Sequence, residues 1–382
     1  MGVEPWTGRV ALVLATSTGG IGRHVASLTA GLVEAGVDVT VYGPAATEER
    51  FGFAARGAGF VPIEIPQALH PRDARTVTAL RRAWNGGHQP DVVHAHGLRA
   101  GLVAASARTA APLVVTWHNT MLAHGLRGQA YRLAERYVAR AADVTLGASA
   151  DLVARASQFG ATDARLGAIA APTLAPPRRT AAAVRAELGV AARTPLLVSV
   201  GRLHPQKGYP TLIAAAGRWR DRDPAPAVVI AGTGPSYRDL AADISASRAP
   251  VTLLGHRDDV ADLLNAADLA VVSSVWEARQ LFAQEALRSG TPLVATAVGG
   301  IPDLVGDAAV LVPAGDVDAL DHAVRELLDD PARRVEYAER GLARSQTWPT
   351  EADTVAQILD VYAELATARD GSGRRSRGTG PR

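Results

Sequence analysis

The chain has 382 residues, of which 47% are hydrophobic and 20% are charged, and its formal net charge at pH 7 is +2. This length favours two domains over a single hydrophobic core, and a charge so close to zero gives no reason to expect a nucleic-acid partner. The chain has no cysteine, no apolar stretch near the roughly 20 residues of a membrane span, and no basic start typical of a signal peptide. We therefore expect a cytoplasmic protein without disulfides or thiolate zinc sites.

The first half of the chain alternates short apolar runs with helical patterns. Strands are predicted at 10–15, 37–42, 91–94, 113–116 and 143–146, and helices at 23–35 and 124–142. Repeated strand–helix–strand units indicate a parallel, doubly wound sheet. We assign this domain to residues 1–172.

A proline-rich stretch without apolar periodicity follows, and we predict a linker at 173–182. The alternation then restarts in a second domain, 183–347. Six buried strands are predicted there, at 196–200, 228–231, 251–254, 269–272, 293–295 and 309–312. The expected fold class is α/β, with two Rossmann-like doubly wound domains facing each other across a cleft that holds the ligand.

The end of the chain is predicted to form an amphipathic helix over 348–368, begun by a capping box of Thr350 and Asp353. Residues 369–382 are rich in arginine and glycine, a composition that predicts a disordered basic tail.

Lys207 is the only lysine among 40 basic residues. It lies with Gly201 and Arg202 on the loop after the predicted strand 196–200. A compact ammonium and a planar guanidinium five residues apart suit a diphosphate, and Gly201 lets the backbone approach it closely. The alternative is a solvated charged loop.

Three further features follow predicted strands of the second domain. Gly232 lies in a second glycine turn, and Arg257 follows the strand 251–254, where backbone groups could face a nucleotide base. Glu277 and Glu285 are separated so that Glu277 precedes a helix and Glu285 lies one turn into it. Carboxylates placed in this way can accept hydrogen bonds from sugar hydroxyls, although exposed helices often carry such pairs by chance.

In the first domain, Gly19 and Gly20 form a turn between a strand and a helix, where backbone amides can receive phosphate. The turn also resembles a dehydrogenase fingerprint, but the pattern is incomplete and no acidic residue ends the second strand. A tight packing turn is the remaining alternative.

Histidines end two predicted strands of the first domain: His94 and His96 on one, and His118 beyond the other. The carboxyl ends of parallel strands border the ligand cleft. Because no carboxylate lies at ligand spacing, we expect no metal site.

Taken in order, these motifs resemble the family 4 glycosyltransferases, which are retaining enzymes of the GT-B fold. The resemblance covers about residues 8–365. It rests on Gly19-Gly20-Ile-Gly22, Asp91-Val-Val-His94-Ala-His96, Gly201-Arg202-Leu-His-Pro-Gln-Lys207-Gly208, Gly232-Thr-Gly234-Pro, Glu277 with Glu285, and Gly299-Gly300-Ile-Pro-Asp-Leu-Val.

The resemblance implies a role for each matched residue. Arg202 and Lys207 would bind the donor diphosphate, Glu277 the transferred hexose and Glu285 the ribose. His118 would lie near the sugar. Gly19 and Gly20 would close over the phosphate, and the backbone at Arg257 would contact the base.

One segment departs from the family pattern. Where relatives have a glycine-rich, aromatic stretch after the first glutamate, this chain has Ala278-Arg279-Gln280. We expect Arg279 to contact the donor or the acceptor.

The implied reaction is hexosyl transfer from a nucleotide-diphosphate sugar to a lipid, glycan or small-molecule acceptor, with retention and without a cofactor or metal. Two alternatives remain open: a nucleotide-sugar epimerase on the same fold, and a non-catalytic nucleotide-sugar binder.

An arginine stripe of Arg132, Arg136 and Arg140, with Leu133, Tyr137 and Val138 beside it, has two interpretations. It is a docking face for the anionic inner surface of the plasma membrane, or an ordinary solvated helix face.

Overall fold

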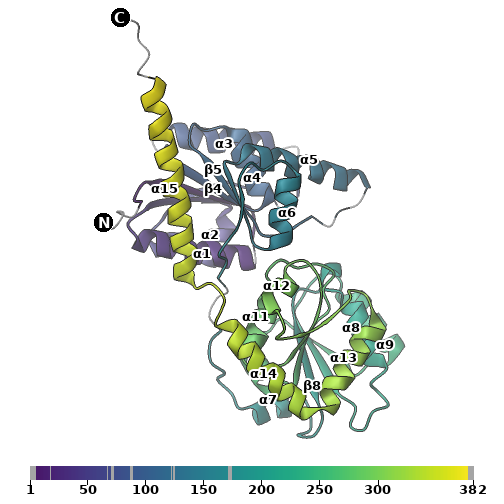
Figure 1. Ribbon diagram of the computed structural model, residues 1–382. Coiled ribbons are helices and arrows are strands. Elements are labelled where there is room, and N and C mark those ends of the chain that lie inside the picture. The colour runs from purple at the N-terminus through teal and green to yellow at the C-terminus, as the bar shows by residue number, and fades with distance from the viewer. Residues whose placement is uncertain are drawn as a thin grey trace, which may run out of the picture. The chain divides into compact units, whose positions relative to one another are not determined.

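The computed structural model describes residues 6–17, 19–66, 68–69, 73–86, 89–121, 123, 125–170 and 174–376, with side chains as far as residue 368. The chain divides into two compact units (Figure 1). The first unit is Met1–Pro172 with Pro349–Arg382, and the second is Thr173–Trp348.

The first unit is built on a seven-stranded sheet in the order β3-β2-β1-β4-β5-β6-β7, with every neighbouring pair parallel. Its central strands are buried on both faces, which explains their largely apolar sequences. The strands are β1 Arg9–Leu14, β2 Asp38–Gly43, β3 Gly59–Pro62, β4 Val92–His96, β5 Leu113–Trp117, β6 Val144–Gly147 and β7 Ala164–Leu166.

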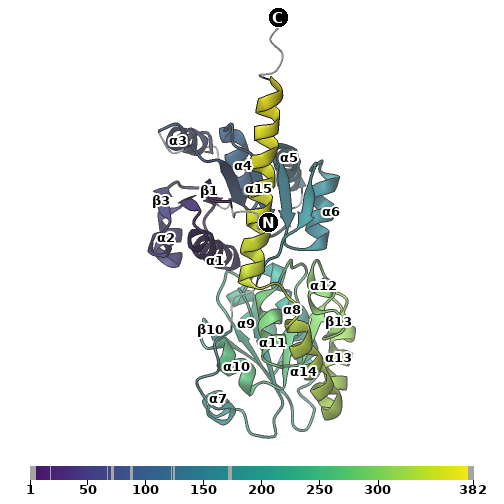
Figure 2. The ribbon, with the colours of Figure 1, turned by 60° about the vertical axis from the view of Figure 1, so that its left-hand side comes forward.

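Helices cover both faces of this sheet (Figures 1 and 2). One face carries α1 and α15, whose apolar side chains share a core with the central strands. Among the other helices, α4 packs between α3 and α5 and contacts both. The helices are α1 Gly20–Glu34, α2 Ala45–Phe51, η1 Ala54–Arg56, α3 Asp73–Asn85, α4 Leu98–Ala107, α5 Gly125–Ala141, α6 Ala150–Gln158 and α15 Glu351–Ser376.

Helix α15 joins the first unit although it follows the second in sequence, and it runs beside α1. Gly31 of α1 makes room for it, because a Cβ there would lie 2.4 Å from Val355 Cγ2. The predicted capping box is confirmed: the Asp353 amide donates to Thr350 Oγ1, and the Thr350 amide donates to Asp353 Oδ2. The helical backbone reaches Ser376, within the segment predicted to be disordered, and residues 377–382 lie outside the described residues.

The second unit has a six-stranded parallel sheet in the order β10-β9-β8-β11-β12-β13. Separate apolar clusters fill its two faces, one beneath α7, α10, α11 and α12 and the other beneath α8, α9 and α13. The strands are β8 Leu196–Val200, β9 Ala227–Ala231, β10 Val251–Gly255, β11 Leu269–Val272, β12 Leu293–Thr296 and β13 Val310–Val312. The helices are α7 Ala181–Glu187, η2 Pro205–Lys207, α8 Tyr209–Gly217, α9 Tyr237–Ser247, α10 Val260–Ala266, α11 Leu281–Arg288, α12 Ile301–Val305, α13 Val317–Asp329 and α14 Pro331–Ser345.

Both sheets are doubly wound, as predicted, and each reverses its strand order once. The reversal lies between β1 and β4 in the first sheet and between β8 and β11 in the second. Ligands of such folds bind beyond the carboxyl ends of the strands at this switch point. No helix in the described part of the chain is long and apolar enough to cross a membrane.

Candidate active site

Two loops leave the carboxyl ends of β8 and β11, which are neighbours at the switch point of the second sheet. Lys207 on the first loop donates from Nζ to Glu277 Oε1 of the second at 2.6 Å. The Ser274 hydroxyl donates to the same carboxylate oxygen at 2.8 Å. The Lys207 and Glu277 side chains are only 20% and 10% exposed. The ion pair is therefore largely shielded from water, and it holds both groups in place.

Three further hydrogen bonds to backbone carbonyls join the two loops. Gln206 Nε2 donates to the Trp276 carbonyl at 2.9 Å, and the Val275 amide donates to the Gln206 carbonyl at 2.8 Å. Ser273 Oγ donates to the Lys207 carbonyl at 3.0 Å. The position of the ammonium therefore depends on a set of bonds between the loops rather than on one flexible side chain.

Two glycines allow this close approach. Gly208 has a φ of 62°, and a Cβ there would lie 1.9 Å from the Ser273 carbonyl oxygen. A Cβ at Gly232 would lie 1.9 Å from the carbonyl oxygen of Gly201. These positions exclude any side chain, because a backbone oxygen cannot rotate away.

Two further candidate residues lie near these loops in sequence: Arg202 on the loop after β8, and Glu285 on helix α11. Arg202 is exposed, and no hydrogen bond or ion pair to another described residue fixes its side chain. Glu285 is half-buried on the second turn of α11. Arg202 is therefore open to a ligand, and it lies on the same loop as Lys207.

Arg257 differs from this pattern because its side chain is already engaged. Its guanidinium pairs with Asp259 at 2.6 Å and with Glu187 at 2.7 Å, and these hydrogen-bonded carboxylates raise its pKa. Arg179 pairs with the same two acids. The side chain thus belongs to a surface ion network, and only the backbone role expected from the sequence stays a prediction.

Arg279 is half-buried and forms no ion pair with any acid in the described part of the chain. Its Nε and Nη2 atoms are buried, and no described residue hydrogen-bonds to them. Burial, reinforced by the charges of Arg344 and Arg288, lowers its pKa to about 10. Its neighbour Gln280 is the N-cap of α11, and its side chain accepts from the Ala283 amide at 2.6 Å.

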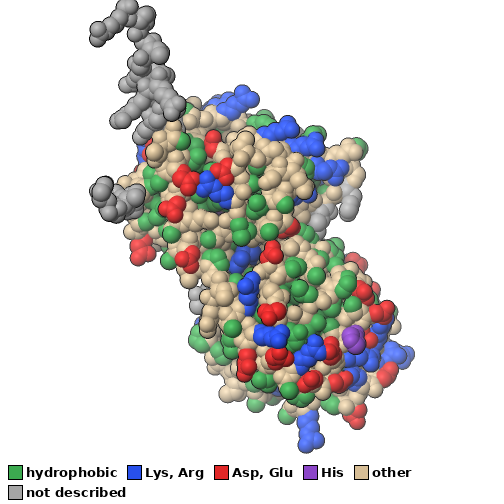
Figure 3. Space-filling view, in the orientation of Figure 1, with side chains coloured by type: hydrophobic (Ala, Val, Ile, Leu, Met, Phe, Trp, Pro, Cys, Tyr) green, Lys and Arg blue, Asp and Glu red, His purple; other side chains and the backbone are tan. Residues whose placement is uncertain are grey.

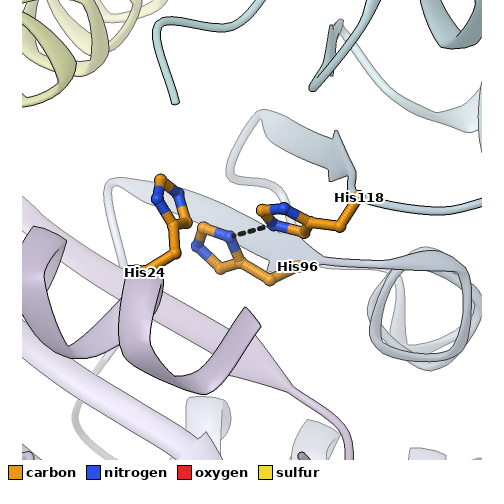
Figure 4. A group of neighbouring side chains, drawn as sticks. All are labelled: His24, His96 and His118. Atoms are coloured by element: carbon orange, nitrogen blue, oxygen red, sulfur yellow. Dashed lines mark hydrogen bonds between the residues drawn. The ribbon is translucent and has the colours of Figure 1, made fainter. Parts of the chain in front are cut away.

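The switch point of the first sheet holds a group of histidines (Figure 4). His96 ends β4, His118 directly follows β5, and His24 lies on the second turn of α1. His96 Nδ1 and His118 Nε2 are 3.3 Å apart. One nitrogen from each of the three rings can be chosen so that all lie within 4.8 Å of one another.

Beneath this group, His94 is fully buried and hydrogen-bonded at both nitrogens, to the Tyr362 hydroxyl and to Thr116 Oγ1, each at 2.7 Å. Burial lowers the pKa of His24 to about 4. Burial and the charge of His24 lower the pKa of His94 to about 3. Burial and neighbouring histidines hold the pKa values of His96 and His118 well below their usual value.

The glycine turn of the first unit lies beside this group in sequence. Gly19 is the N-cap of α1, and Gly19 and Gly20 are both exposed. Ser17 Oγ accepts from the Gly22 amide at 3.0 Å, which fixes the turn. Of the candidate residues, Gly19, Gly20 and His118 thus belong to the first unit, and the others to the second.

Comparison with known proteins agrees with this layout. Residues 19–172 match the family described as "Glycosyl transferase 4-like domain", and residues 194–330 match "Glycosyl transferases group 1". A glycogen synthase of Mycobacterium tuberculosis is 32% identical over 386 residues, covering 89% of this chain and 90% of that protein. The chain belongs to the family 4 glycosyltransferases.

Other similar proteins place this glycosyltransferase in a functionally varied group. A D-inositol 3-phosphate glycosyltransferase of Kineococcus radiotolerans is 32% identical, covering 95% of this chain and 94% of the relative. The structure of HepE from Anabaena in complex with UDP-glucose has a TM-score of 0.78 at 19% identity, covering 94% of this chain and all of that one. The fold is GT-B, and the chain is a nucleotide-sugar-dependent glycosyltransferase.

Two residues of the glycosyltransferase had no role in the sequence prediction. Ser274 lies three residues before Glu277 and donates to its carboxylate. His24 joins two histidines from strands 70 or more residues later. Its helix begins at Gly20, three residues before the predicted start, which puts His24 on the turn that faces the strand ends.

We expect the first unit of the glycosyltransferase to lose stability below about pH 6.5. Its buried histidines stay neutral when folded, whereas an unfolded chain protonates them near pH 6.5. Below that pH the unfolded state binds more protons than the folded state. The free energy of unfolding therefore decreases as the pH is lowered, by up to about 1.4 kcal/mol per pH unit for each histidine. Urea unfolding at pH 7.5, 6.5 and 5.5 measures this slope.

Two glutamine variants serve as test and control for this slope. His24→Gln removes one buried group, and its free energy of unfolding should depend less steeply on pH. His322→Gln changes an exposed histidine of the second unit and should keep the wild-type slope. Equal slopes for wild type and His24→Gln would contradict the expectation.

Proposed function

We propose that this glycosyltransferase moves a hexosyl unit with retention of configuration, and that Lys207 and Glu277 form the centre of its donor site. The observation that supports this most directly is the shielded Lys207–Glu277 pair at the switch point of the second sheet. It combines a cation for the diphosphate with a carboxylate for sugar hydroxyls. The complex of HepE with UDP-glucose supports testing a uridine diphosphate sugar first.

In this proposal the bond between the anomeric carbon and the donor diphosphate breaks. The leaving diphosphate gains negative charge, which Arg202, Lys207 and amides of the glycine turn at Gly201 and Gly232 stabilise electrostatically. Glu277 binds the hexose hydroxyls. The acceptor oxygen attacks the face from which the diphosphate departs, and its proton leaves with the departing phosphate oxygen.

The remaining donor contacts follow the same resemblance. Glu285 holds the ribose hydroxyls, and the backbone at Arg257 faces the base. Gly19, Gly20 and His118 are assigned to the phosphate and sugar side from the first unit.

Arg279 is proposed to bind an anionic group of the donor sugar or the acceptor. A guanidinium with two buried, unpartnered nitrogens and two further arginines nearby has unused capacity for a bidentate acidic ligand. This would distinguish the enzyme from relatives that have glycine and an aromatic residue here.

A thermal-shift screen of nucleotide sugars tests the donor assignment, because a ligand of the native state raises the apparent stability. The best donor is then incubated with and without acceptors. Transfer that is lost in Glu277→Ala supports the proposal. Epimerised donor without any acceptor indicates the epimerase, and donor binding without turnover indicates a non-catalytic binder. Arg279→Ala is included to find ligands whose affinity depends on that cation.

For the acceptor, we propose that α5 docks on an anionic membrane and so brings the enzyme to a lipid acceptor. The exposed side chains of α5 are Leu126, Arg127, Gln129, Ala130, Arg132, Leu133, Arg136, Tyr137, Arg140 and Ala141. Leu126 and Leu133 are 84% and 65% exposed and lie seven residues apart, on one side of the helix. Basic side chains gather over this helix on the surface (Figure 3).

One residue of the predicted stripe does not belong to this face. Val138 is fully buried, and a Cβ on Gly101 would lie 2.9 Å from its Cγ1. The single acid of α5, Glu135, is also buried and pairs with Arg155 at 2.6 Å. The exposed face of α5 thus carries basic and apolar side chains with one glutamine and no acid, as expected of an interfacial helix.

We expect the enzyme to sediment with phosphatidylglycerol vesicles at low salt and to be released at high salt, where the charges are screened. Leu126→Gln/Leu133→Gln should weaken vesicle binding at least tenfold, because two leucines no longer enter the interface. Leu166→Gln, at an exposed leucine on β7, is the matched control. A protein that stays in the supernatant at low salt would refute membrane docking.

A further inference from the structure

We propose that His24, His96 and His118 form a binding site for a divalent transition metal such as Zn²⁺. All three histidines belong to the first unit, and the site does not depend on the proposed transfer reaction. It also departs from our expectation from the sequence, which did not include His24 and therefore lacked a third converging ligand.

The geometry of the group fits metal coordination without rearranging the strands. In a tetrahedral zinc site, nitrogens about 2.0–2.1 Å from the metal lie roughly 3.3–3.4 Å from one another. His96 Nδ1 and His118 Nε2 are already 3.3 Å apart. His24 supplies a third nitrogen within the 4.8 Å that encloses the group, so a side-chain rotation of His24 completes three ligands.

The other nitrogen of the central ring is unsatisfied. His96 Nε2 is buried and has no hydrogen-bond partner among the described residues, and His96 is only 2% exposed. Buried ring nitrogens are almost always satisfied. In Figure 4 this second nitrogen of His96 lies on the side of the His24 ring, away from His118. His96 can therefore offer either Nδ1, beside His118, or Nε2, on the side of His24, and a single metal ion takes one of the two.

The surrounding structure fixes the central ring. His94 stacks on His96 with ring centroids 4.2 Å apart, and both of its own nitrogens are engaged by Tyr362 and Thr116. His94 therefore supports the site and is not a ligand. Three imidazoles without a carboxylate or thiolate favour Zn²⁺, Cu²⁺ or Ni²⁺ over Mg²⁺ or Ca²⁺.

Metal binding would also affect transfer activity, and this second part of the inference rests on the role proposed for His118. His118 is assigned there to the sugar side of the reaction. A metal held by His118 removes that imidazole from the substrate, so we expect Zn²⁺ to inhibit transfer. The site would be an inhibitory metal site.

Cobalt(II) tests the site independently of activity, because tetrahedral Co²⁺ absorbs strongly in visible light. Tag-free, chelator-treated protein is titrated with Co²⁺, and Zn²⁺ is then added as competitor. We expect one Co²⁺ per chain with a visible band that Zn²⁺ removes. His24→Gln and His118→Gln should weaken Co²⁺ affinity at least tenfold, whereas His322→Gln, an exposed histidine, should bind as wild type does.

Absence of the band in folded wild type overturns the metal site, and so does unchanged affinity in His24→Gln. Circular dichroism establishes that each variant is folded, and two ligand variants guard against failure of one to fold. Transfer activity is measured with Zn²⁺ in parallel. A visible band without inhibition leaves the metal site standing and overturns the inhibitory role, which separates failure of the site from failure of the role assigned to His118.

Discussion

Lys207→Ala is expected to lower kcat/KM for glycosyl transfer by about 100- to 1000-fold, the usual effect of removing one preorganised electrostatic group. The substitution removes the cation proposed for the diphosphate. It also leaves the Glu277 carboxylate, whose side chain is only 10% exposed, without its ion-pair partner. A steady-state assay with the donor found by thermal shift measures the change.

Two further variants separate charge from shape at this position. Lys207→Arg keeps the charge, but it replaces the compact ammonium bonded to Glu277 by a wider guanidinium, in a place where the lysine stem already lies close to Gly201. We expect it to restore little activity. Arg193→Ala removes an exposed cation before β8 and should be neutral. Wild-type kcat/KM in folded Lys207→Ala would rule out the proposed donor site.

Gly208→Ala is expected to destabilise the second unit by about 2–5 kcal/mol and to abolish most transfer. Alanine at a φ of 62° costs about 1–2 kcal/mol by itself. Its Cβ would also lie 1.9 Å from the Ser273 carbonyl oxygen, so the β8 and β11 loops must separate. Urea unfolding gives the stability, and the transfer assay gives the loss of function.

Gly315→Ala isolates the conformational part of this cost. Gly315 has a φ of 77°, and an added Cβ would meet nothing within 4 Å. We expect the backbone strain alone to lower its free energy of unfolding, by about 1–2 kcal/mol, and its transfer activity to be kept. If Gly208→Ala and Gly315→Ala unfold at the same urea concentration, the close approach of the loops does not contribute to stability.

The sequence predicted the buried strands well because they are short, apolar and bounded by turns. All six strands of the second unit lie within two residues of their predicted limits. The edge strands β3 and β7 were not predicted, since they are short and only half-buried and lack a continuous apolar run. The edge of a sheet requires less apolar sequence than its centre.

Individual site residues were predictable, but their pairings were not. Lys207 and Glu277 are each marked by their motifs, yet they are 70 residues apart, and their contact depends on β8 lying next to β11. His24 meets His96 for the same reason, through the neighbouring strands β1 and β4. Strand order is a property of the whole fold, and a local pattern does not contain it.

Arg257 and Arg279 differ in how much of their environment the local sequence contains. One of the two acids that engage Arg257 is only two residues away, at Asp259, so the sequence already contained the signal for a local ion pair. The environment of Arg279 could not be foreseen, because the burial of its Nε and Nη2 depends on how segments distant in sequence pack around it.

The use of both chain ends in the first unit sets the order in which the protein can be completed during synthesis. Helix α15 supplies Tyr362, the partner of the buried His94, but it leaves the ribosome only after the whole segment Thr173–Trp348. At about 5–20 residues per second this delay is roughly 10–35 s. During that interval the nascent first unit exposes the apolar surface that α15 later covers, so chaperones have their main opportunity to bind it before the last helix emerges.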